Sequence, residues 1–355
     1  MIFLTSDWHV HNYPQFSKPW SPGLNTRARD IYEIVGKKIP ELLLQKYQPK
    51  VLAYLGDFNF FASNDYRLEN LTRRAINKCA STVKCTVVCS GNHDTVGTDS
   101  ADHNGRLYLP HANWAPFVYR EFQSQTSCLF YPIGYNHPMP TAKDLLLVGA
   151  AKVDHVIVLM HKNIEHGIAS SGFIYSSAKE VKIRNLLEIK KEIPSIMYFG
   201  GHYHDHQIIR KLVCIVGAPV QHRRSDENLN RGVVLFNPED KSIRKITLKT
   251  GPQFISTDVD HLEAYSKSPQ NHYITVKVVD EVQKRTAFEW IRDTKVNAKV
   301  KELDHDELVA GGFEEEEEEV KEVSDAELLD TWLQMKAPDL TLRQRGELVK
   351  VAEAL

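Results

Sequence analysis

Five short clusters of side chains with oxygen or nitrogen donors recur along this 355-residue chain, up to His204. They consist mainly of Asp, Asn, His and Gly. The clusters are Asp7-Trp8-His9, Gly56-Asp57, Gly91-Asn92-His93-Asp94, His161 and Gly201-His202-Tyr203-His204. Carboxylate, amide and imidazole donors without cysteine suit manganese, iron or magnesium-like ions better than structural zinc. The sequence therefore predicts a site for divalent metal ions.

The spacing of these donors is compatible with a pair of ions. Two divalent ions about 3.5–4 Å apart can clamp a phosphodiester and activate a bridging water. Such a pair needs one carboxylate that bridges the ions, and Asp57 is the natural candidate. Asp7 and His9 would point to one ion if their segment is extended. His202 and His204 permit the same arrangement, although sharing between two ions is equally consistent with their spacing.

Most of the clusters follow short apolar runs. These runs are rich in β-branched residues and end at glycine or polar residues, which is typical of buried strands. They cover residues 2–4, 51–55, 86–89, 156–160 and 196–199. Side chains just past strand ends can converge at one edge of a sheet, and we expect the site there.

Helical periodicity separates several of these strands. Apolar spacing predicts helices over residues 27–48, 68–80 and 178–191. Further strands are predicted at 145–148, 213–216, 232–236 and 243–248, with 213–216 and 232–236 paired to each other. Residues 95–140 are predicted to form loops with short strands. The alternation of strands and helices indicates an α/β layered domain.

The pattern changes after Pro252. Residues 273–279, 286–293 and 296–303 are predicted to form a strand, a helix and a strand. They make a small, separate β-α-β unit.

The last part of the chain combines a charged linker with two helix starts. Glutamates at 314–319 indicate a solvated linker. Capping-box patterns that begin at Ser324 and Thr341 predict two short amphipathic helices. These helices either dock on another protein, as helix-in-groove contacts do, or fold back on their own domain.

Charge is distributed unevenly along the chain. The net charge is -2, but residues 304–330 hold 13 acidic residues and one basic residue. The rest of the chain carries 43 of the 44 Lys and Arg against 33 of the 46 Asp and Glu. This basic balance suits a polyanionic substrate, although an ordinary solvated surface explains it equally well.

Composition sets broader limits. A hydrophobic content of 42% and a charged content of 25% are ordinary for a globular protein of about two domains. Five cysteines without a CxxC pattern suggest buried thiols in a reducing compartment. The sequence shows no signal peptide and no apolar run of membrane length. We therefore expect a cytoplasmic protein without membrane contact.

The order of the motifs, DxH, GD, GNHD, His and GHxH, resembles the calcineurin-like metallophosphoesterase superfamily over residues 1–250. Residues Gly217-Ala218-Pro219-Val220-Gln221-His222, followed by Arg231-Gly232, are similar to the SbcD-type, meiotic-recombination-eleven-like DNA nuclease branch. The β-α-β unit, the acidic linker and the terminal helices are most similar to the small subunit of phage recombination endonucleases.

This resemblance implies a fold and a division of the chain. The expected fold is an α/β/β/α sandwich of two mixed sheets flanked by helices, with a β-α-β capping domain and a C-terminal helical hairpin. The implied parts are a nuclease domain at 1–252, a DNA-binding capping domain at 253–303, an acidic linker at 304–323 and a helical segment at 324–355.

The resemblance also implies an activity and its partners. The family hydrolyses DNA as an exonuclease and an endonuclease with two Mn²⁺ ions, for which Mg²⁺ is a weaker substitute. It works in SbcCD-like recombination and repair complexes in the cytoplasm of bacteria or phage-infected cells. A coiled-coil ATPase of the SbcC type would bind residues 324–355, and the nuclease subunit would form a homodimer.

Residue roles follow from the same resemblance. The first ion would be bound by Asp7, His9, Asp57 and His204. The second ion would be bound by Asp57, Asn92, His161 and His202. His93 would donate a proton to the leaving oxygen or stabilise the transition state, and Asp94 would orient His93.

Some positions depart from the family pattern or allow two interpretations. Phe60 replaces a His or Asp that is common in relatives, which puts an exonuclease step in doubt. His11 and His206 are interpreted as surface residues, with a supporting role behind the ligands as the alternative for His11. Trp8 is interpreted as a packing residue rather than a base-stacking platform. Three arginines could contact DNA phosphates or serve as surface charges; they are Arg223, Arg224 and Arg231.

Two other functions use the same residues. A small-molecule phosphatase or cyclic-nucleotide phosphodiesterase would share the metal ligands, but the basic balance and the terminal helices argue against it. A non-catalytic DNA-binding subunit would be expected to have lost ligands, whereas every ligand position is filled here.

Overall fold

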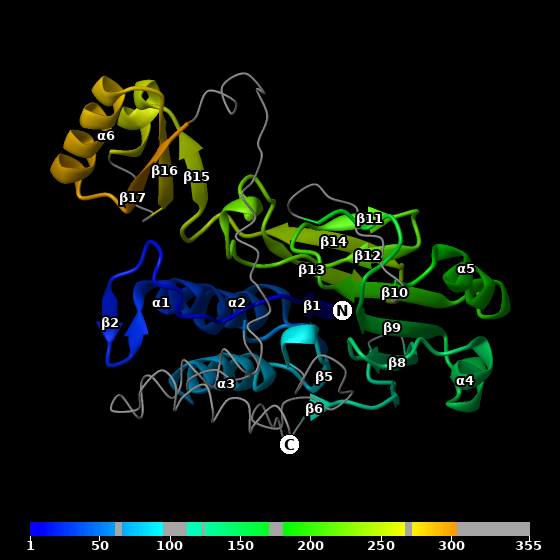
Figure 1. Cartoon of the computed structure of the whole chain (residues 1–355). Coiled ribbons are helices and arrows are strands. Elements are labelled where there is room, and N and C mark those ends of the chain that lie inside the picture. Colours follow the sequence, from blue (N-terminus) through cyan, green and yellow to red (C-terminus); the bar gives the residue numbers. More distant parts are fainter. Residues whose placement is uncertain (61–65, 95–111, 123–124, 170–179, 267–271, 304–355) are drawn as a thin grey trace, which may run out of the picture. The chain divides into compact units, whose positions relative to one another are not determined.

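The computed structural model of the chain describes residues 1–60, 66–94, 112–122, 125–169, 180–266 and 272–303. They belong to a compact unit, Met1–Asp304 (Figure 1). The predicted linker at 304–323 and the helical segment at 324–355 lie outside the described residues. Within the described ranges, no helix is both long and apolar enough to cross a membrane.

One six-stranded sheet is built around the N-terminal strand, in the order β14-β13-β1-β4-β5-β6. Its strands are β1 (Ile2–Thr5), β4 (Val51–Leu55), β5 (Cys85–Cys89), β6 (Ala112–Asn113), β13 (Gly232–Asn237) and β14 (Ser242–Thr247). β1 pairs parallel with β4 and antiparallel with β13, so the sheet is mixed. Leu55 lies opposite Cys89, and Thr5 opposite Tyr54. The carboxyl ends of β1, β4 and β5 therefore meet at one edge.

A second six-stranded sheet has the order β11-β12-β10-β9-β8-β7. Its strands are β7 (Phe117–Tyr119), β8 (Cys128–Ile133), β9 (His155–His161), β10 (Ile196–Gly201), β11 (Gln207–Ile209) and β12 (Val213–Ile215). β9 and β10 are parallel, with Gly201 opposite His161. Both strands therefore deliver their last residues to the same edge.

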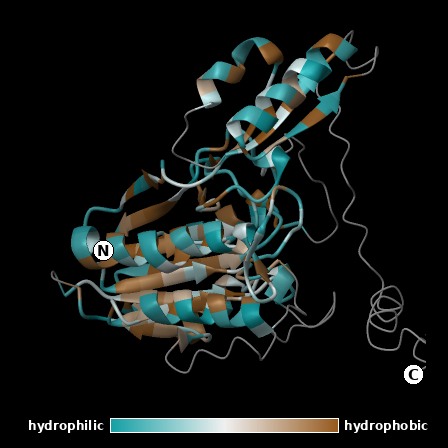
Figure 2. Cartoon of the chain, turned by 90° about the vertical axis from the view of Figure 1, so that its left-hand side faces the viewer, coloured by the Kyte–Doolittle hydropathy of each residue, from teal (hydrophilic) through white to brown (hydrophobic). Residues whose placement is uncertain are grey.

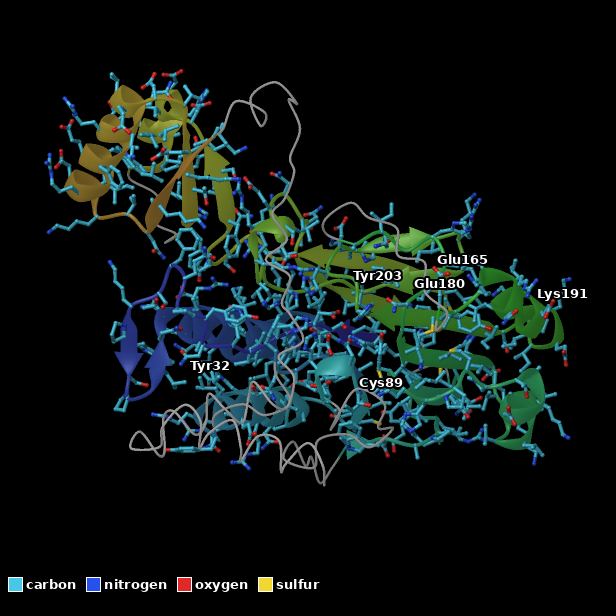
Figure 3. All side chains as sticks on the ribbon, viewed as in Figure 1. Tyr32, Cys89, Glu165, Glu180, Lys191 and Tyr203 are labelled. Atoms are coloured by element: carbon cyan, nitrogen blue, oxygen red, sulfur yellow. The ribbon has the colours of Figure 1, made fainter. Side chains whose placement is uncertain are left out.

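The two sheets pack face to face because alternate strand residues are apolar on both sides. Ile2 and Leu4 share a buried cluster with Leu159 and Phe199 from the other sheet. Phe3 points the other way and belongs to the cluster under the first group of helices. Figure 2 shows apolar strands inside and mostly polar helix surfaces outside. Figure 3 labels Cys89, one of the buried cysteines in the central cluster.

Helices cover the outer faces of both sheets (Figure 1). The first sheet is covered by α1 (Thr26–Tyr32), α2 (Ile39–Glu41) and α3 (Tyr66–Ala80), and the second by α4 (Ala142–Leu147) and α5 (Ile183–Glu192). The predicted sandwich of two mixed sheets flanked by helices is confirmed. A two-stranded hairpin, β2 (Pro19–Ser21) and β3 (Leu24–Asn25), precedes α1.

The helix predicted over residues 27–48 is present but irregular. Its turns widen into π-helix at Glu33–Lys38 and Leu42–Tyr47, on either side of α2. Pro40 lies in α2 and has no N–H to donate, so the regular α-helical hydrogen bonds are interrupted there. The segment ends at Gln48, which adopts a left-handed conformation and donates its N–H to Leu43.

Two strand predictions were wrong. Residues 145–148 were predicted as a strand, but 142–147 form α4, which begins with a capping box between Thr141 and Asp144. Ala142 and Leu145 are buried while Leu147 is exposed, a helical period that a run of leucines conceals.

The predicted pairing of 213–216 with 232–236 is also wrong. β12 pairs with β10 and β11, whereas β13 pairs with β1 and β14 in the other sheet. Both strands are buried and apolar, so their local pattern does not identify their partners. The segment between them crosses from one sheet to the other and carries His222 and Asp226.

The β-α-β unit has one more strand than predicted. β15 (Phe254–Thr257) pairs parallel with β16 (Tyr273–Val278), which pairs parallel with β17 (Ala298–Glu302). The crossover helix α6 (Glu281–Thr294) begins where the Asp280 side chain accepts the N–H of Gln283. The buried core of this unit consists of Leu262, Ile274, Val276, Val278, Ala287 and Trp290. We call residues 254–302 the β15–β17 module.

Candidate metal centre

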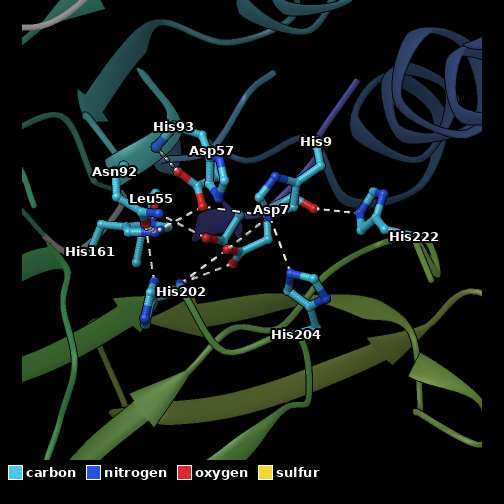
Figure 4. Close-up of polar contacts among 12 residues, drawn as sticks. Asp7, His9, Leu55, Asp57, Asn92, His93, His161, His202, His204 and His222 are labelled. Carbon is cyan, nitrogen blue, oxygen red and sulfur yellow. Dashed lines mark hydrogen bonds and ion pairs between the residues drawn. The ribbon is translucent and has the colours of Figure 1, made fainter. Parts of the chain in front are cut away.

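Side chains from all five sequence clusters meet at the edge where β1, β4, β5, β9 and β10 end (Figure 4). Ligand atoms within 4.8 Å of one another form three overlapping groups. The groups are Asp7, His9 and His204; His9, Asp57 and His93; and Asp57, His161 and His202. Both sheets contribute to the site. Such a concentration of carboxylate and imidazole donors could bind metal ions.

Four of the predicted ligands have a backbone conformation that residues other than glycine rarely adopt. The φ angles are +52° at Asp7, +39° at His9, +56° at Asp57 and +85° at His202. The prediction that Asp7 and His9 share a face of an extended segment was therefore wrong, although both lie in one group. Left-handed residues of this kind cost free energy and concentrate at functional sites.

Hydrogen bonds between strand-end loops hold these conformations. The N–H of Asp7 donates to Gly56 O at 3.0 Å, and that of His9 donates to Asp57 O at 2.9 Å. Asp94 accepts the N–H of Asp57 at 2.7 Å through Oδ2 and that of Phe58 at 3.0 Å through Oδ1. The carboxylate of Asp94 thus joins the Gly56-Asp57 loop to its own turn.

Asp94, which was predicted to orient His93, contacts the Asp57 backbone, and His93 contacts the Asp57 side chain. The backbone N–H of His93 donates to Asp57 Oδ1 at 3.0 Å. The His93 ring lies with its centroid 5.0 Å from that of His9, and it is half-buried. His93 therefore faces the same space as the ligands from a less buried side.

One end of the site is built around His161. Its Nε2 lies 3.1 Å from Asp57 Oδ2 and 3.2 Å from Asn92 Oδ1. His202 Nδ1 also lies 3.2 Å from Asn92 Oδ1. On its other side, His161 Nδ1 donates to the carbonyl oxygen of Leu55 at 2.5 Å. That bond directs Nε2 toward the other donors.

The other end brings two imidazoles together. His9 Nε2 lies 3.1 Å from His204 Nε2 and 3.5 Å from Asp57 Oδ2. The Asp226 carboxylate accepts the Nδ1–H of His204 at 2.9 Å, so the Nε2 of His204 faces His9. Asp7 offers a carboxylate oxygen to the same group, and these three side chains could bind one metal ion.

Burial and neighbouring charges favour the protonation states that bind a cation. Burial opposes ionisation of Asp57, but the positive charge of His161 beside it holds its pKa well below its usual value. Burial, reinforced by the charge of His161, lowers the pKa of His202 to about 3. Burial likewise lowers the pKa of His9. Asp57 is therefore ionised at neutral pH, while His9 and His202 are unprotonated.

Two predicted ligands behave differently. Burial alone would lower the pKa of His161, but the Asp57 carboxylate raises it to about 9. Burial, together with the charge of Asp57, raises the pKa of Asp7 to about 6. A cation bound here would displace the proton of His161 at neutral pH.

Sequence reasoning missed two residues behind the ligands. Asp226 is fully buried and contacts His204, and it also accepts the N–H of His222 at 2.7 Å. His222 Nε2 donates to the carbonyl oxygen of Asp7 at 3.0 Å. The motif around His222 supported only the family resemblance, and Asp226 follows it without a recognisable metal-ligand spacing.

Several residues with two interpretations now have a location. His11 is buried, so its interpretation as a surface residue was wrong. His206 is half-buried. Trp8 is a packing residue, as predicted, with its ring 5.0 Å from that of Tyr54. The Phe60 ring lies 5.0 Å from the His93 ring and forms an apolar wall beside it.

The three arginines differ in exposure. Arg231 is buried and donates to Pro252 O at 2.9 Å, so both its predicted DNA contact and its role as a surface charge were wrong. Arg223 is exposed and Arg224 is half-buried. Their contact with DNA remains a prediction.

Comparisons with known proteins do not assign a family. No protein-family model matches the chain, and no curated protein matches it. Among solved structures, one described as PhdJ bound to substrate intermediate is 10% identical, with a TM-score of 0.17. The match covers 84% of this chain, which spans 59% of the length of that protein. A likeness this weak carries no argument about fold or function.

Proposed function

We propose that this chain is a metal-dependent DNA phosphodiesterase with two Mn²⁺ ions, for which Mg²⁺ can substitute. The observation that carries the proposal is the position of Asp57, which belongs to two ligand groups and lies between His9 and His161. A carboxylate in that position can be shared by two cations. The motif order and the basic balance of the main body support DNA as the substrate.

The distances favour the ligand assignment that the motifs imply. Asp7, His9, Asp57 and His204 would hold one ion, and Asp57, Asn92, His161 and His202 would hold the other. Ions bound here would stabilise negative charge on a phosphate and assist ionisation of a water molecule.

His93 would act on the substrate rather than hold an ion. It is half-buried, and its backbone is fixed by Asp57. From there the ring can donate a proton to the leaving oxygen or stabilise charge on the phosphate. Phe60 occupies the neighbouring position with an apolar ring, so His93 works without a polar group from that residue.

The proposal extends to the cellular assembly. We infer an exonuclease and endonuclease subunit of an SbcCD-like recombination and repair complex, acting as a homodimer. Residues 253–303 would help to hold DNA, and residues 324–355 would bind a coiled-coil ATPase. These inferences come from the order and character of the sequence segments.

Cleavage of labelled double- and single-stranded DNA with Mn²⁺ tests the activity. Asp57→Asn and His93→Ala should each reduce the cleavage rate by about 10²–10⁴-fold. The matched control Asp240→Asn changes an exposed residue outside the site and outside residues 253–303, and it should cut as the parent does. Parental cleavage by Asp57→Asn or His93→Ala would refute the assignment. Turnover of nucleotide monoesters without DNA cleavage would favour a small-molecule phosphatase.

Truncation before Ser324 tests the partner. Residues 1–304 form a compact unit of their own, so the truncated protein should bind Mn²⁺ like the full chain. It should no longer co-purify with the ATPase subunit. Retained co-purification would refute docking through residues 324–355.

A further inference from the structure

Arg27 is a buried arginine between the β15–β17 module and the metal centre. It lies at the start of α1 and is only 2% exposed. Its Nη2 donates to the carbonyl oxygen of His222 at 2.7 Å and lies 3.4 Å from His11 Nε2. Its Nη1 donates weakly to Gln15 O at 3.4 Å. Within the described part of the chain, its Nε has no hydrogen-bond partner.

Two aromatic rings of the β15–β17 module hold the guanidinium. Its central carbon lies 4.4 Å from the ring centroid of Tyr273 and 5.0 Å from that of Phe254. Both distances are typical of cation–π contacts. Both residues are also hydrogen-bonded to the rest of the protein. The Tyr273 hydroxyl donates to Asp30 at 2.8 Å, and the Phe254 N–H donates to Gln221 at 2.7 Å.

His222 continues the connection to the ligands. Its backbone carbonyl accepts from Arg27. Its Nε2 donates to the carbonyl oxygen of Asp7 (Figure 4). Its N–H donates to Asp226, which in turn fixes His204. One residue therefore contacts Arg27, the Asp7 segment and the partner of His204. Each step is a hydrogen bond between 2.7 and 3.0 Å.

The free energy of this arrangement argues for a role beyond packing. Burying a guanidinium is unfavourable unless its donors are satisfied, and one donor here is not. An apolar side chain of similar size would fill the space between the two rings at less cost. Such a side chain could not donate a hydrogen bond to the His222 carbonyl, as Arg27 does.

We propose that Arg27 is a positioning residue that couples the β15–β17 module to the metal centre, by holding His222 and through it Asp7 and His204. The proposal rests on the metal site of the proposed function, but not on its substrate. Because coupling is reciprocal, a ligand that shifts Phe254 or Tyr273 changes metal affinity, and metal binding changes the affinity for that ligand.

Titration of the full-length protein with Mn²⁺ tests the coupling. Arg27→Lys keeps the charge but loses the planar fork, and Phe254→Leu removes one ring. Each should raise the Kd for Mn²⁺ by about 10–100-fold, as changes behind metal ligands do. The matched control is Arg244→Lys, because Arg244 lies 5.4 Å from the Tyr47 ring, outside the site. It should leave the Kd unchanged.

Two further measurements separate positioning from general destabilisation. In ¹⁵N spectra of histidine, wild-type His204 should carry its proton on Nδ1, and Arg27→Lys should populate the other tautomer. The double variant Arg27→Lys, Phe254→Leu should weaken Mn²⁺ binding by less than the two single effects combined, because both substitutions disrupt the same contact. Melting temperatures near the wild-type value identify the variants that remain folded.

The outcomes distinguish this proposal from the proposed function. If folded Arg27→Lys and Phe254→Leu bind Mn²⁺ with wild-type affinity, the coupling is refuted, whatever DNA cleavage shows. If the wild-type protein binds Mn²⁺ with the predicted coupling but cleaves no DNA, the nuclease assignment fails and the coupling stands.

Discussion

His161 is the predicted ligand whose proton competes most directly with a metal ion. Its Nε2 faces Asp57 Oδ2 at 3.1 Å, and the carboxylate raises its pKa to about 9 against the effect of burial. At neutral pH the imidazole is therefore protonated and paired with Asp57. Binding of a cation at that nitrogen requires loss of the proton.

Mn²⁺ affinity should rise with pH for this reason. Between pH 7 and 9 the Kd of the site that contains His161 should fall about tenfold per pH unit, and it should level off above pH 9. Calorimetry in buffers of different ionisation enthalpy should show about one proton released at pH 7. A Kd that stays flat across this range would contradict the assigned protonation of His161.

The stability of EDTA-treated protein should change in the opposite direction. A histidine whose pKa is raised in the folded state stabilises the fold fully below its unfolded pKa of about 6.5. That contribution is lost as pH rises through about 9. Alkaline pH therefore weakens the His161–Asp57 pair while it strengthens metal binding, and the two trends have one cause.

The turn that follows β5 shows how closely the site elements approach each other. A Cβ at Gly91 would collide with the Asp57 carboxylate and would lie 2.5 Å from the Asp57 backbone nitrogen. The nitrogen of Gly91 also donates to Asp94 at 2.9 Å. The β4 and β5 loops can therefore meet around Asp57 only where this position has no side chain.

Gly91→Ala should displace Asp57 and weaken Mn²⁺ binding at both proposed sites. We expect a Kd at least about 10-fold higher, with destabilisation of about 1–3 kcal/mol from the steric clash. Gly149→Ala is the control, because its Cβ would meet nothing within 4 Å, although its φ of +105° adds strain. It should lower stability without changing the Kd. Unchanged Mn²⁺ affinity in Gly91→Ala would contradict the tight approach.

Strand ends were predictable from the sequence because apolar runs and the polar residues after them are local signals. They placed Asp7, Asp57, Asn92, His161 and His202 at one edge of the sheets. The choice of sheet for β12 and β13 was not predictable, since both are uniformly buried and pairing depends on distant partners. The segment that crosses between these strands carries His222 and Asp226. Because the crossing was not predicted, neither residue was placed behind the ligands.

At the scale of the whole molecule, the ligands come from both sheets of the sandwich. Asp7, Asp57 and Asn92 follow strands of the first sheet, whereas His161 and His202 end or follow strands of the second. The central apolar cluster already packs the sheets against each other. A pair of bound ions would add a polar link at the open edge, and unfolding would have to break it.

Mn²⁺ should therefore stabilise the folded protein in proportion to its occupancy. At a free concentration of 100 times the Kd, each site should add about 2.7 kcal/mol, provided that the unfolded chain does not bind the ion. For a domain of this size, the melting temperature should rise by about 5 °C or more.

Asp57→Asn should abolish most of the rise, and Asp240→Asn, which changes an exposed residue, should keep it. Differential scanning calorimetry with Mn²⁺ and with EDTA provides the measurement. An equal melting temperature in both conditions would mean that the clustered side chains do not hold metal ions in the folded protein.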